Sequence, residues 1–384
     1  MRYFFYAKSN DDLISVFSLS KMFSGPISLI SPDQAILKHL KEHIDLLGGG
    51  ELPSASFADP QKGDVVFVHS YVSRFEKQAL KNNPLLVSIV YFYDCILWPP
   101  EKFEYADKVC VISELCQSLT IDSLRLNFAC SEKRIRTIKN KFIVIGALHQ
   151  EFTKTIVSMH KTNGETGNYS LVVTPNFFML YSRVVFLKSL LALLGQMFQY
   201  RKLPRKIISD AFRVNLKDLV EAIDKVSAFK GVETVYRSRE KDRPAVIRSI
   251  EEFTGRPVIR RPSIDLSEDN NALLISNSAF TITWQSFSCL EAAAFNRPCL
   301  NLMLPVHDMW IERIDKARIY VSELRGQRLG SMVNFPGVNS CLHPDELIHL
   351  TIGGEYNIVQ DINLDALEKY CELYFPRAKI GKFL

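Results

Sequence analysis

The fold class is decided by residues 280–302, which read Phe-Thr-Ile-Thr-Trp-Gln-Ser-Phe-Ser-Cys-Leu-Glu-Ala-Ala-Ala-Phe-Asn-Arg-Pro-Cys-Leu-Asn-Leu. The stretch begins with a short run typical of a strand, passes through a small polar turn, and continues into an alanine-rich segment that favours a helix. A second apolar run, Pro298–Met303, predicts another strand. Strand, helix and strand in this order form the unit of parallel sheets with crossover helices.

The same alternation extends through most of the chain. Before residue 146, apolar runs separated by helical stretches predict strands at 2–7, 26–30, 64–69, 85–93, 108–112 and 142–145. After a polar segment at 161–168, the pattern restarts with strands predicted at 170–174, 232–236, 257–260, 279–283 and 298–303. We therefore predict an α/β chain with two doubly wound, Rossmann-like parallel sheets that face a cleft.

The polar segment also sets the predicted domain boundaries. The first domain is predicted to cover residues 1–160 and the second residues 168–360. A predicted helix at the C-terminal end, within 364–384, is expected to pack back onto the first domain. The length of 384 residues suits two α/β domains of ordinary size.

Composition and charge narrow the class of protein. An apolar share of 47% with 23% charged residues is an ordinary globular balance, and it argues against long disordered segments. The excess of Lys and Arg over Asp and Glu is five, and these residues are dispersed. This excess is too small to indicate a nucleic-acid binder, although anionic ligands and a membrane surface remain compatible with it.

Cysteine usage and the first residues indicate a cytoplasmic protein. The eight cysteines include no CxxC pair, and most lie in apolar segments, as expected for buried reduced thiols. Residues 1–6 form a short apolar run followed at once by Lys8, Asp11 and Asp12. This pattern predicts a first buried strand and no secretory leader.

One segment raises the question of a membrane. Phe177–Phe198 is apolar and long enough to span a bilayer, but Arg183 and Lys188 interrupt it. A charge near the centre of a bilayer costs roughly 2.5–3.5 kcal/mol. We favour a core helix or a helix in peripheral contact with the inner face of the membrane over a spanning helix.

Hydroxyl groups and an acid open the predicted helix within 280–302. Ser286 or Ser288 at the helix start would leave backbone N–H groups directed at a ligand, which is a typical phosphate site. Glu291, in the first turns, could accept hydrogen bonds from a ribose diol. The alternative is structural: Ser286 is then an ordinary N-cap, and Glu291 a favourable charge near the helix dipole.

This stretch resembles the nucleotide-binding signature of the GT-B glycosyltransferases, a strand and small-polar turn followed by Glu-Ala, small or apolar residues, Gly-x-Pro and a strand. Residues 106–113 are similar to a strand that ends the N-terminal domain in that superfamily, and residues 142–146 to the element before its linker. The chain departs from the pattern at Asn296, where a glycine is usual. Within that superfamily, the chain most resembles the bacterial enzymes of capsule and lipopolysaccharide synthesis.

The resemblance implies that the second domain holds a nucleotide-activated sugar. Arg237, Arg239 and Arg261 follow or end predicted strands, and their guanidinium groups match phosphate oxygens. The alternative for the first two is a solvated loop paired with nearby acids. The donor-binding residues that we predict are Ser286, Ser288, Glu291, Arg237, Arg239, Arg261, Ser263 and His307.

Two residues in the first domain compete as the catalytic base. Asp94 ends a strongly apolar predicted strand, where burial would raise its pKa, and His69 ends a neighbouring predicted strand. Each also has a structural alternative, as a turn cap or as a hydrogen-bonded residue at a strand end. His39 and His43 lie four residues apart, but no further ligand pattern supports a metal site.

Together these features predict a metal-independent glycosyltransferase of the GT-B type, without a cofactor other than its donor. It would move a sugar from a nucleotide-activated donor to the hydroxyl of a glycan or glycolipid acceptor, in the synthesis of bacterial surface polysaccharide. One alternative is a sugar-nucleotide 2-epimerase of the same fold, although such enzymes have more acids and glycines at the signature helix. The other is a non-catalytic module that binds a nucleotide or sugar.

Overall fold

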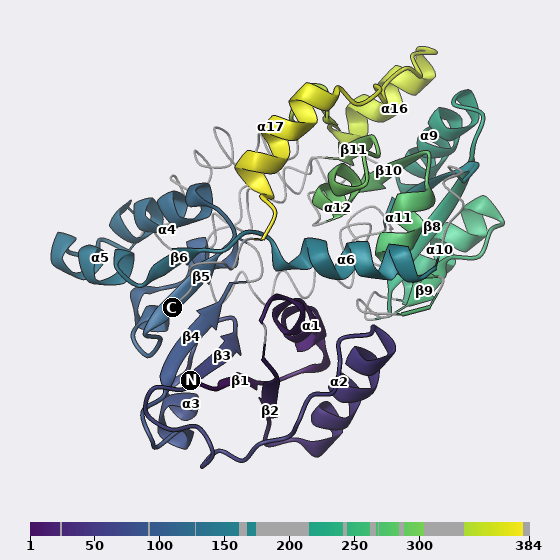
Figure 1. Cartoon of the computed structure of the whole chain (residues 1–384). Coiled ribbons are helices and arrows are strands. Elements are labelled where there is room, and N and C mark those ends of the chain that lie inside the picture. The colour runs from purple at the N-terminus through teal and green to yellow at the C-terminus, as the bar shows by residue number, and fades with distance from the viewer. Residues whose placement is uncertain are drawn as a thin grey trace. The chain divides into compact units, whose positions relative to one another are not determined.

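The computed structural model divides the chain into two compact units (Figure 1). The first unit comprises Met1–Lys161 and Cys371–Leu384, and the second comprises Thr162–Tyr370. The residues that the structure describes are 1–23, 25–90, 93–126, 128–160, 167–173, 215–240, 244–261, 266–267, 269–283, 288–302 and 334–378.

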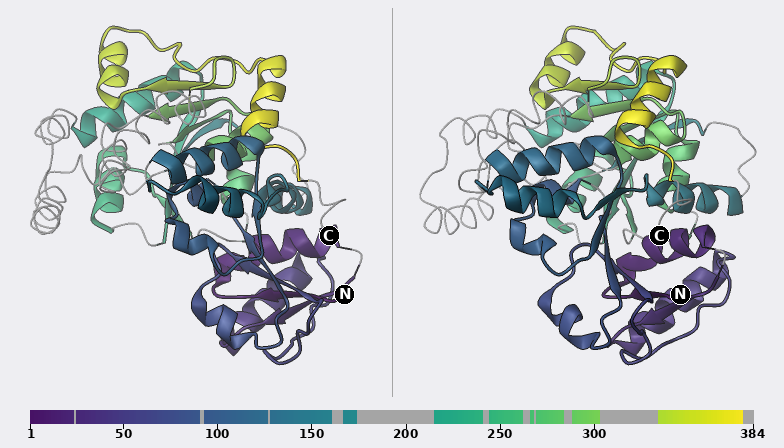
Figure 2. Two further views of the ribbon diagram at one scale, coloured as in Figure 1. Left: turned by 90° about the vertical axis from the view of Figure 1, so that its left-hand side faces the viewer. Right: turned by 60° about the vertical axis from the view of Figure 1, so that its left-hand side comes forward.

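The first unit is built on a six-stranded sheet in the order β2-β1-β3-β4-β5-β6, and all neighbouring strands are parallel. Its strands are β1 (Tyr3–Tyr6), β2 (Ile27–Ile30), β3 (Val65–His69), β4 (Leu85–Ile89), β5 (Lys108–Val111) and β6 (Phe142–Val144). The helices are α1 (Leu13–Met22), α2 (Gln34–Leu46), α3 (Arg74–Ala79), α4 (Glu114–Leu126), α5 (Glu132–Lys139) and α6 (Leu148–Met159). The two turned views show how these helices cover the sheet (Figure 2).

Side-chain caps explain where several helices of this unit begin. Asp33 precedes α2 and accepts a hydrogen bond from the backbone N–H of Ala35 at 2.8 Å. Ser73 and Glu76 form a reciprocal capping box at the start of α3. Each cap satisfies backbone donors that would otherwise lack partners at the start of a helix.

The chain returns to the first unit after helix α17 (Leu364–Tyr374), whose last residues belong to this unit. Ala147 N–H donates to the carbonyl of Pro376 at 2.8 Å, and Tyr93 donates its hydroxyl proton to the carbonyl of Tyr374 at 3.0 Å. Gly146 has a φ of +82°, and a Cβ there would lie 2.5 Å from Ala378 Cα. A glycine is therefore required where the returning segment meets the end of the first sheet.

The second unit contains another parallel six-stranded sheet, in the order β12-β11-β10-β7-β8-β9. Counted from β7, this is the strand order 3-2-1-4-5-6 of dinucleotide-binding folds. Its strands are β7 (Tyr169–Val173), β8 (Glu233–Arg239), β9 (Ile259–Arg261), β10 (Phe280–Thr283), β11 (Cys299–Leu302) and β12 (Asn339–Leu342). The prediction of two doubly wound parallel sheets is confirmed, while the cleft between two domains stays a prediction.

The two faces of the second sheet differ in chemistry. Its described helices are α9 (Leu216–Phe229), α10 (Pro244–Thr254), α11 (Asn271–Asn277), α12 (Ser288–Ala294) and α16 (Pro344–Ile352). Buried apolar residues of the strands, such as Tyr236 and Ile282, form one core with α9, α10 and α16. Because side chains alternate along a strand, Arg237, Thr283 and Asn301 point to the opposite face. All three are buried, so this face has a polar interior at its carboxyl end.

Two strand boundaries and one additional strand differ from the prediction. β4 ends at Ile89, and Asp94 begins a short 3-10 helix (Asp94–Leu97), so Asp94 does not end a strand as predicted. β8 extends to Arg239, because its last three residues pair with β9. Arg237 and Arg239 therefore lie within the strand, and the prediction that they follow it is wrong. Strand β12 is not predicted from the sequence at all.

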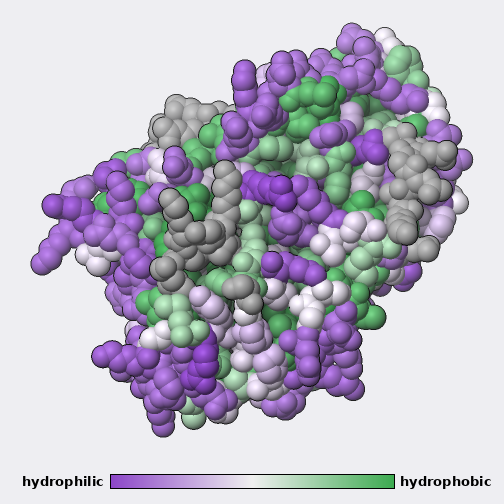
Figure 3. Space-filling view, in the orientation of Figure 1, coloured by the Kyte–Doolittle hydropathy of each residue, from purple (hydrophilic) through white to green (hydrophobic). Residues whose placement is uncertain are grey.

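On the face drawn in Figure 3, hydrophilic side chains predominate toward the outer edges, with hydrophobic side chains among them. Within the described ranges, no helix is both long and apolar enough to cross a membrane. The segment Phe177–Phe198, on which the membrane alternatives depend, lies outside the described residues.

Candidate functional site

Strand order locates one candidate site in each unit. In an open parallel sheet, ligands bind beyond the carboxyl ends of the strands, at the point where the order of the strands reverses. In the first sheet this point lies between β1 and β3, and in the second between β7 and β10. Polar and titratable residues cluster at both points.

In the second unit, three side chains form what we call the Asn271 cluster: Asn271, Ser288 and Glu291. Asn271 begins α11, and the other two lie in the first turn of α12. Asn271 Nδ2 donates to Glu291 Oε2 at 2.5 Å and to Ser288 Oγ at 3.2 Å. Ser288 and Glu291 are buried, so a carboxylate is held against an amide beneath the surface. The structure thus brings the predicted Ser288 and Glu291 together.

Polar groups continue from this cluster across the carboxyl end of the second sheet. Thr283 and Asn301 are register partners on β10 and β11. Thr283 Oγ1 and Asn271 Oδ1 are both buried and have no hydrogen-bond partner among the described residues. Leaving a buried polar atom without a partner costs about 1–3 kcal/mol. Such atoms are expected where a bound ligand completes the hydrogen bonding.

The predicted arginines differ in how the protein holds them. Arg237 is buried, and its Nε donates to the carbonyl of Asp269 at 3.3 Å. Arg261 is half exposed and donates from Nε to Asp269 Oδ2 at 2.7 Å, with a second bond from Nη2 to the same oxygen. Arg239 lies opposite Arg261 in the register of β8 and β9. Asp269 thus links two of the three arginines, and the sequence analysis did not identify it.

Three predicted donor-binding residues, Ser286, Ser263 and His307, lie outside the described residues. The predicted start of the helix at Ser286 is therefore untested. The described part of α12 begins at Ser288 and ends at Ala294.

In the first unit, His69 is the centre of the polar group at the switch point. It is the last residue of β3, and its Nδ1 lies 3.0 Å from Ser15 Oγ and 3.9 Å from Asp12 Oδ1. Asp12 is almost fully buried, and its Oδ2 accepts backbone hydrogen bonds from Lys8 at 2.6 Å and Ser9 at 3.1 Å. We call His69, Ser15 and Asp12 the His69 cluster.

The surroundings of this cluster shift the pKa values of its members in opposite directions. Desolvation lowers the pKa of His69, and the charge of Lys8 lowers it further, against the raising effect of Asp12, Asp94 and Asp11. Desolvation raises the pKa of Asp12. It also raises the pKa of Asp94, although Asp94 is exposed to solvent. The interaction of His69 with Asp94 shows that the two predicted bases belong to one electrostatic group.

The backbone beside His69 is unusual. Ser70 has a φ of +64°, in the left-handed region, and its N–H donates to the carbonyl of Ile89 at 2.8 Å. Non-glycine residues adopt this conformation uncommonly, and they do so more often at functional sites. The bond to Ile89 fixes the chain at the point where it leaves β3.

Sequence reasoning missed Asp12 and Ser15 as neighbours of His69. The pattern Asn10-Asp11-Asp12 indicates helix capping, and Asp12 does accept backbone N–H bonds of that kind. Its second role depends on the parallel pairing of β1 with β3, which spans more than 50 residues of chain. No local signal in the sequence gives this neighbour.

His39 and His43, the pair whose spacing could suit a metal ion, lie next to each other on α2. Their rings are 3.9 Å apart on α2, and His43 Nδ1 lies 2.8 Å from the carbonyl oxygen of His39. Across the described part of the chain, no group of three or more potential ligands could hold a metal ion.

Solved structures of other proteins are similar to this chain over nearly its whole length. No protein-family profile matches the chain, and no curated protein matches its sequence. A Listeria monocytogenes protein with the provisional name UDP-N-acetylglucosamine 2-epimerase is similar in structure, with a TM-score of 0.54 at 12% identity, over 98% of this chain and 91% of that one. The UDP-GlcNAc 2-epimerase of Neisseria meningitidis, bound to UDP-GlcNAc, gives 0.50 at 11% identity, over 97% and 99%.

A further UDP-N-acetylglucosamine 2-epimerase gives a TM-score of 0.51 at 13% identity, over 99% of this chain and 100% of that chain. These structures share the two-domain GT-B architecture. This chain has the GT-B fold. At identities of 11–13%, the likeness establishes the fold and leaves the reaction to be argued from the site.

Proposed function

We propose that the chain is an enzyme that acts on a nucleotide-activated sugar, with the nucleotide bound by the second unit. The observation that supports this most is the Asn271 cluster, a buried carboxylate held by an amide at the switch point of the second sheet. In sheets of this topology the switch point is where nucleotides bind. The solved structure of the Neisseria enzyme with UDP-GlcNAc is consistent with such a ligand for this fold.

Within the cluster, Glu291 would bind the ribose. A carboxylate has about four lone-pair positions, and Asn271 occupies one of them. A carboxylate can accept the two hydroxyl protons of a ribose diol through charge-assisted hydrogen bonds. Asn271 would then act as a positioning residue that fixes the carboxylate.

Arg237 and Arg239 would neutralise the diphosphate. Both lie near the carboxyl end of β8, next to β7 at the switch point. Fixed positive charge directed at a leaving diphosphate stabilises the negative charge that develops when the sugar bond breaks. The proposal needs no metal ion for this step.

The first unit would provide proton transfer. The lowered pKa of His69 favours its neutral imidazole, which can accept a proton, and the raised pKa of Asp94 favours its neutral acid. These shifts bring the pKa values of His69 and Asp94 closer to each other, so that either group could exchange a proton with the substrate.

Two reactions fit this arrangement, and 2-epimerisation is the first candidate. Inversion at C2 requires one group to remove the C2 proton while the electron pair forms a C1–C2 double bond and the diphosphate leaves C1 with the C1–O electrons. The diphosphate then returns to C1 as a second group delivers a proton to the opposite face of C2, so that two acid–base groups are needed. His69 and Asp94 could supply them. The three similar structures that we compared are all named as UDP-GlcNAc 2-epimerases, which supports this candidate.

Glycosyl transfer is the second candidate, and the composition of α12 favours it. The helix reads Ser-Cys-Leu-Glu-Ala-Ala-Ala, with one acid and no glycine, unlike the denser acidic and glycine pattern of the epimerases. For this reaction only one base is needed, to deprotonate the hydroxyl of a glycan or glycolipid acceptor. The enzyme would then act in surface-polysaccharide synthesis in the cytoplasm or at the inner membrane face.

One experiment separates the candidates. The full chain is incubated with UDP-GlcNAc without acceptor, and the sugar signals are followed by proton NMR. In deuterated water, an epimerase is expected to exchange the C2 proton and to form the 2-epimer. A transferase is expected to leave C2 unchanged and to release UDP only when an acceptor is present. Failure of the chain to bind UDP-GlcNAc or any other nucleotide sugar would contradict the proposal as a whole.

A further inference from the structure

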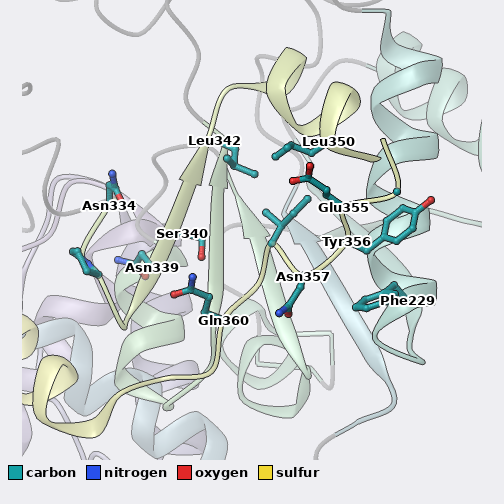
Figure 4. A pocket seen from close by; sticks show the side chains of 13 residues that line it. Phe229, Asn334, Asn339, Ser340, Leu342, Leu350, Glu355, Tyr356, Asn357 and Gln360 are labelled. Carbon is teal, nitrogen blue, oxygen red and sulfur yellow. The ribbon is translucent and has the colours of Figure 1, made fainter. Parts of the chain in front are cut away.

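A pocket lies in the second unit, and none of the residues of the Asn271 cluster lines it (Figure 4). It has a volume of about 630 Å³, within the roughly 300–1,000 Å³ typical of small-molecule sites. Its walls come from the outer strand β12, the end of α9, the end of α16 and the loop that follows α16. None of its lining residues belongs to β10, α11 or α12, so this pocket and the Asn271 cluster are separate sites.

An aromatic pair forms one wall of this pocket. The rings of Phe229 and Tyr356 have centroids 5.5 Å apart and are tilted by 33°. Phe229 is the last residue of α9, and 57% of its surface is exposed. An exposed aromatic face binds apolar surface, and the C–H groups on the flat side of a pyranose ring provide such a surface.

Carboxamide side chains provide the polar part of the lining. Asn334, Asn339, Asn357 and Gln360 line the pocket, and Figure 4 shows their side chains around it. Each carboxamide can both donate and accept, as sugar hydroxyl and acetamido groups also do. Lys230 Nζ donates to Asn357 Oδ1 at 3.3 Å, which holds that amide in place.

The charge of the lining argues against an anionic ligand. Glu355 is its one charged residue, and no described lining residue is basic. A nucleotide or phosphate would meet this carboxylate, and the cation beside the lining, Lys230, already donates to Asn357, whereas an uncharged ligand would meet no charge repulsion. Aromatic faces, carboxamides and the lack of a basic residue all match the chemistry of an uncharged carbohydrate.

We propose that the pocket between Phe229, Tyr356 and β12 binds a neutral glycan segment. The ring of one sugar unit stacks on Phe229, and its hydroxyl or acetamido groups exchange hydrogen bonds with Asn357 and Gln360. This site goes beyond the proposed function, because it is separate from the nucleotide site and does not depend on which reaction the enzyme catalyses.

The test uses the full chain with two uncharged probes, chitotetraose and maltotetraose, in saturation-transfer NMR and calorimetry. We expect at least one of them to bind, and saturating UDP to leave its affinity unchanged. Phe229→Ala is expected to weaken binding at least tenfold. The matched control is Phe253→Ala, which removes an exposed phenylalanine from α10 of the same unit and should bind the probe as the wild type does.

Gln360→Ala provides a second variant on an exposed loop, where the fold is not at risk. It is expected to weaken binding of the same probe without changing the thermal unfolding midpoint. The glycan site would be disproved by no binding of either probe, by wild-type affinity in both variants, or by displacement with UDP. Loss of UDP binding in the same samples would instead contradict the proposed function and leave this site untouched.

Discussion

The carboxyl ends of the two sheets have the same topology but different chemistry. Between β1 and β3 lie titratable groups, the His69 cluster with Asp94 beside it. Between β7 and β10 lie the amide, hydroxyl and carboxylate of the Asn271 cluster, and Arg237 on the neighbouring strand β8 donates to the carbonyl of Asp269. The groups in the first unit can gain or lose a proton. The groups in the second unit mainly form hydrogen bonds with fixed donors and acceptors. This difference in chemistry supports the proposal that the first unit transfers protons and the second binds the ligand.

The largest effect is expected from His69→Gln. The amide keeps a polar group near Ser15 but cannot act as a base, so we expect turnover of the sugar nucleotide to fall roughly 10²–10⁴-fold. UDP affinity, measured by calorimetry, should stay at the wild-type value because the proposed nucleotide site lies in the other unit. His43→Gln, on α2, is the matched control and should retain full turnover. Wild-type turnover in the His69 variant would show that the His69 cluster does not transfer protons.

The second largest effect is expected from Glu291→Ala. It removes the carboxylate that Asn271 holds, and we expect UDP affinity to weaken by about 1–3 kcal/mol, the cost of unpaired polar groups. Glu291→Gln, which preserves volume, reports the charge alone, and a thermal melt checks that both variants fold. Glu252→Ala, on the exposed side of α10, should bind UDP normally. Unchanged UDP affinity in the Glu291 variants would contradict the proposal that the Asn271 cluster binds the nucleotide.

A smaller effect is expected from Asp12→Asn. The charge of Asp12 raises the pKa of His69, so its removal should lower that pKa further. The acid limb of the activity profile should then move to lower pH, because His69 stays neutral in more acidic solution. Titration of the His69 ring by NMR measures the shift directly. Asp11→Asn removes an exposed charge that acts in the same direction more weakly, and it should give a smaller shift. A rise in the pKa would contradict the arrangement.

The smallest effect on activity is expected from Asp64→Asn. This variant should change how the stability of the protein depends on pH without changing the titration of the His69 cluster. Arg2 holds Asp64 in a salt bridge at 2.6 Å, and its hydrogen bonds lower the pKa of Asp64 from 3.8 to about 2. Because the folded-state pKa is the lower one, this stabilisation exists above pH 4 and is lost as the pH falls toward 2. The variant should be less stable at pH 7, and urea titrations should show the two proteins converging near pH 2. Activity at neutral pH should not change.

Sequence patterns predicted the sheets well because hydrophobic periodicity is local. The strand Tyr3–Tyr6 lies within the predicted range 2–7, and α17 lies within the predicted range 364–384. β12 was missed because Asn339, Ser340 and Cys341 lack a strong apolar pattern. It lies at the edge of the sheet, where parallel pairing with β11 is enough to form a strand.

The sites were predicted less completely than the strands. Ser288, Glu291 and Arg237 were named from their position after or within strands of the second domain. Their partners Asn271 and Asp269 were not named, because loops and short helices carry no periodic signal that marks a contact. In the first unit, Asp94 was named for the wrong reason: it lies five residues beyond the end of its strand, and its relation to His69 is electrostatic.

Alternating apolar strands and amphipathic helices are enough to predict two parallel α/β sheets, because this pattern allows few other arrangements. The local pattern also shows that polar residues follow several of the strands. Which of these polar residues come into contact depends on the three-dimensional arrangement of the strands. The order of strands places Asp12 and Ser15 beside His69, and Asn271 beside Glu291, through pairings between segments far apart in the chain. Such neighbours depend on sheet topology, and local sequence does not encode that topology.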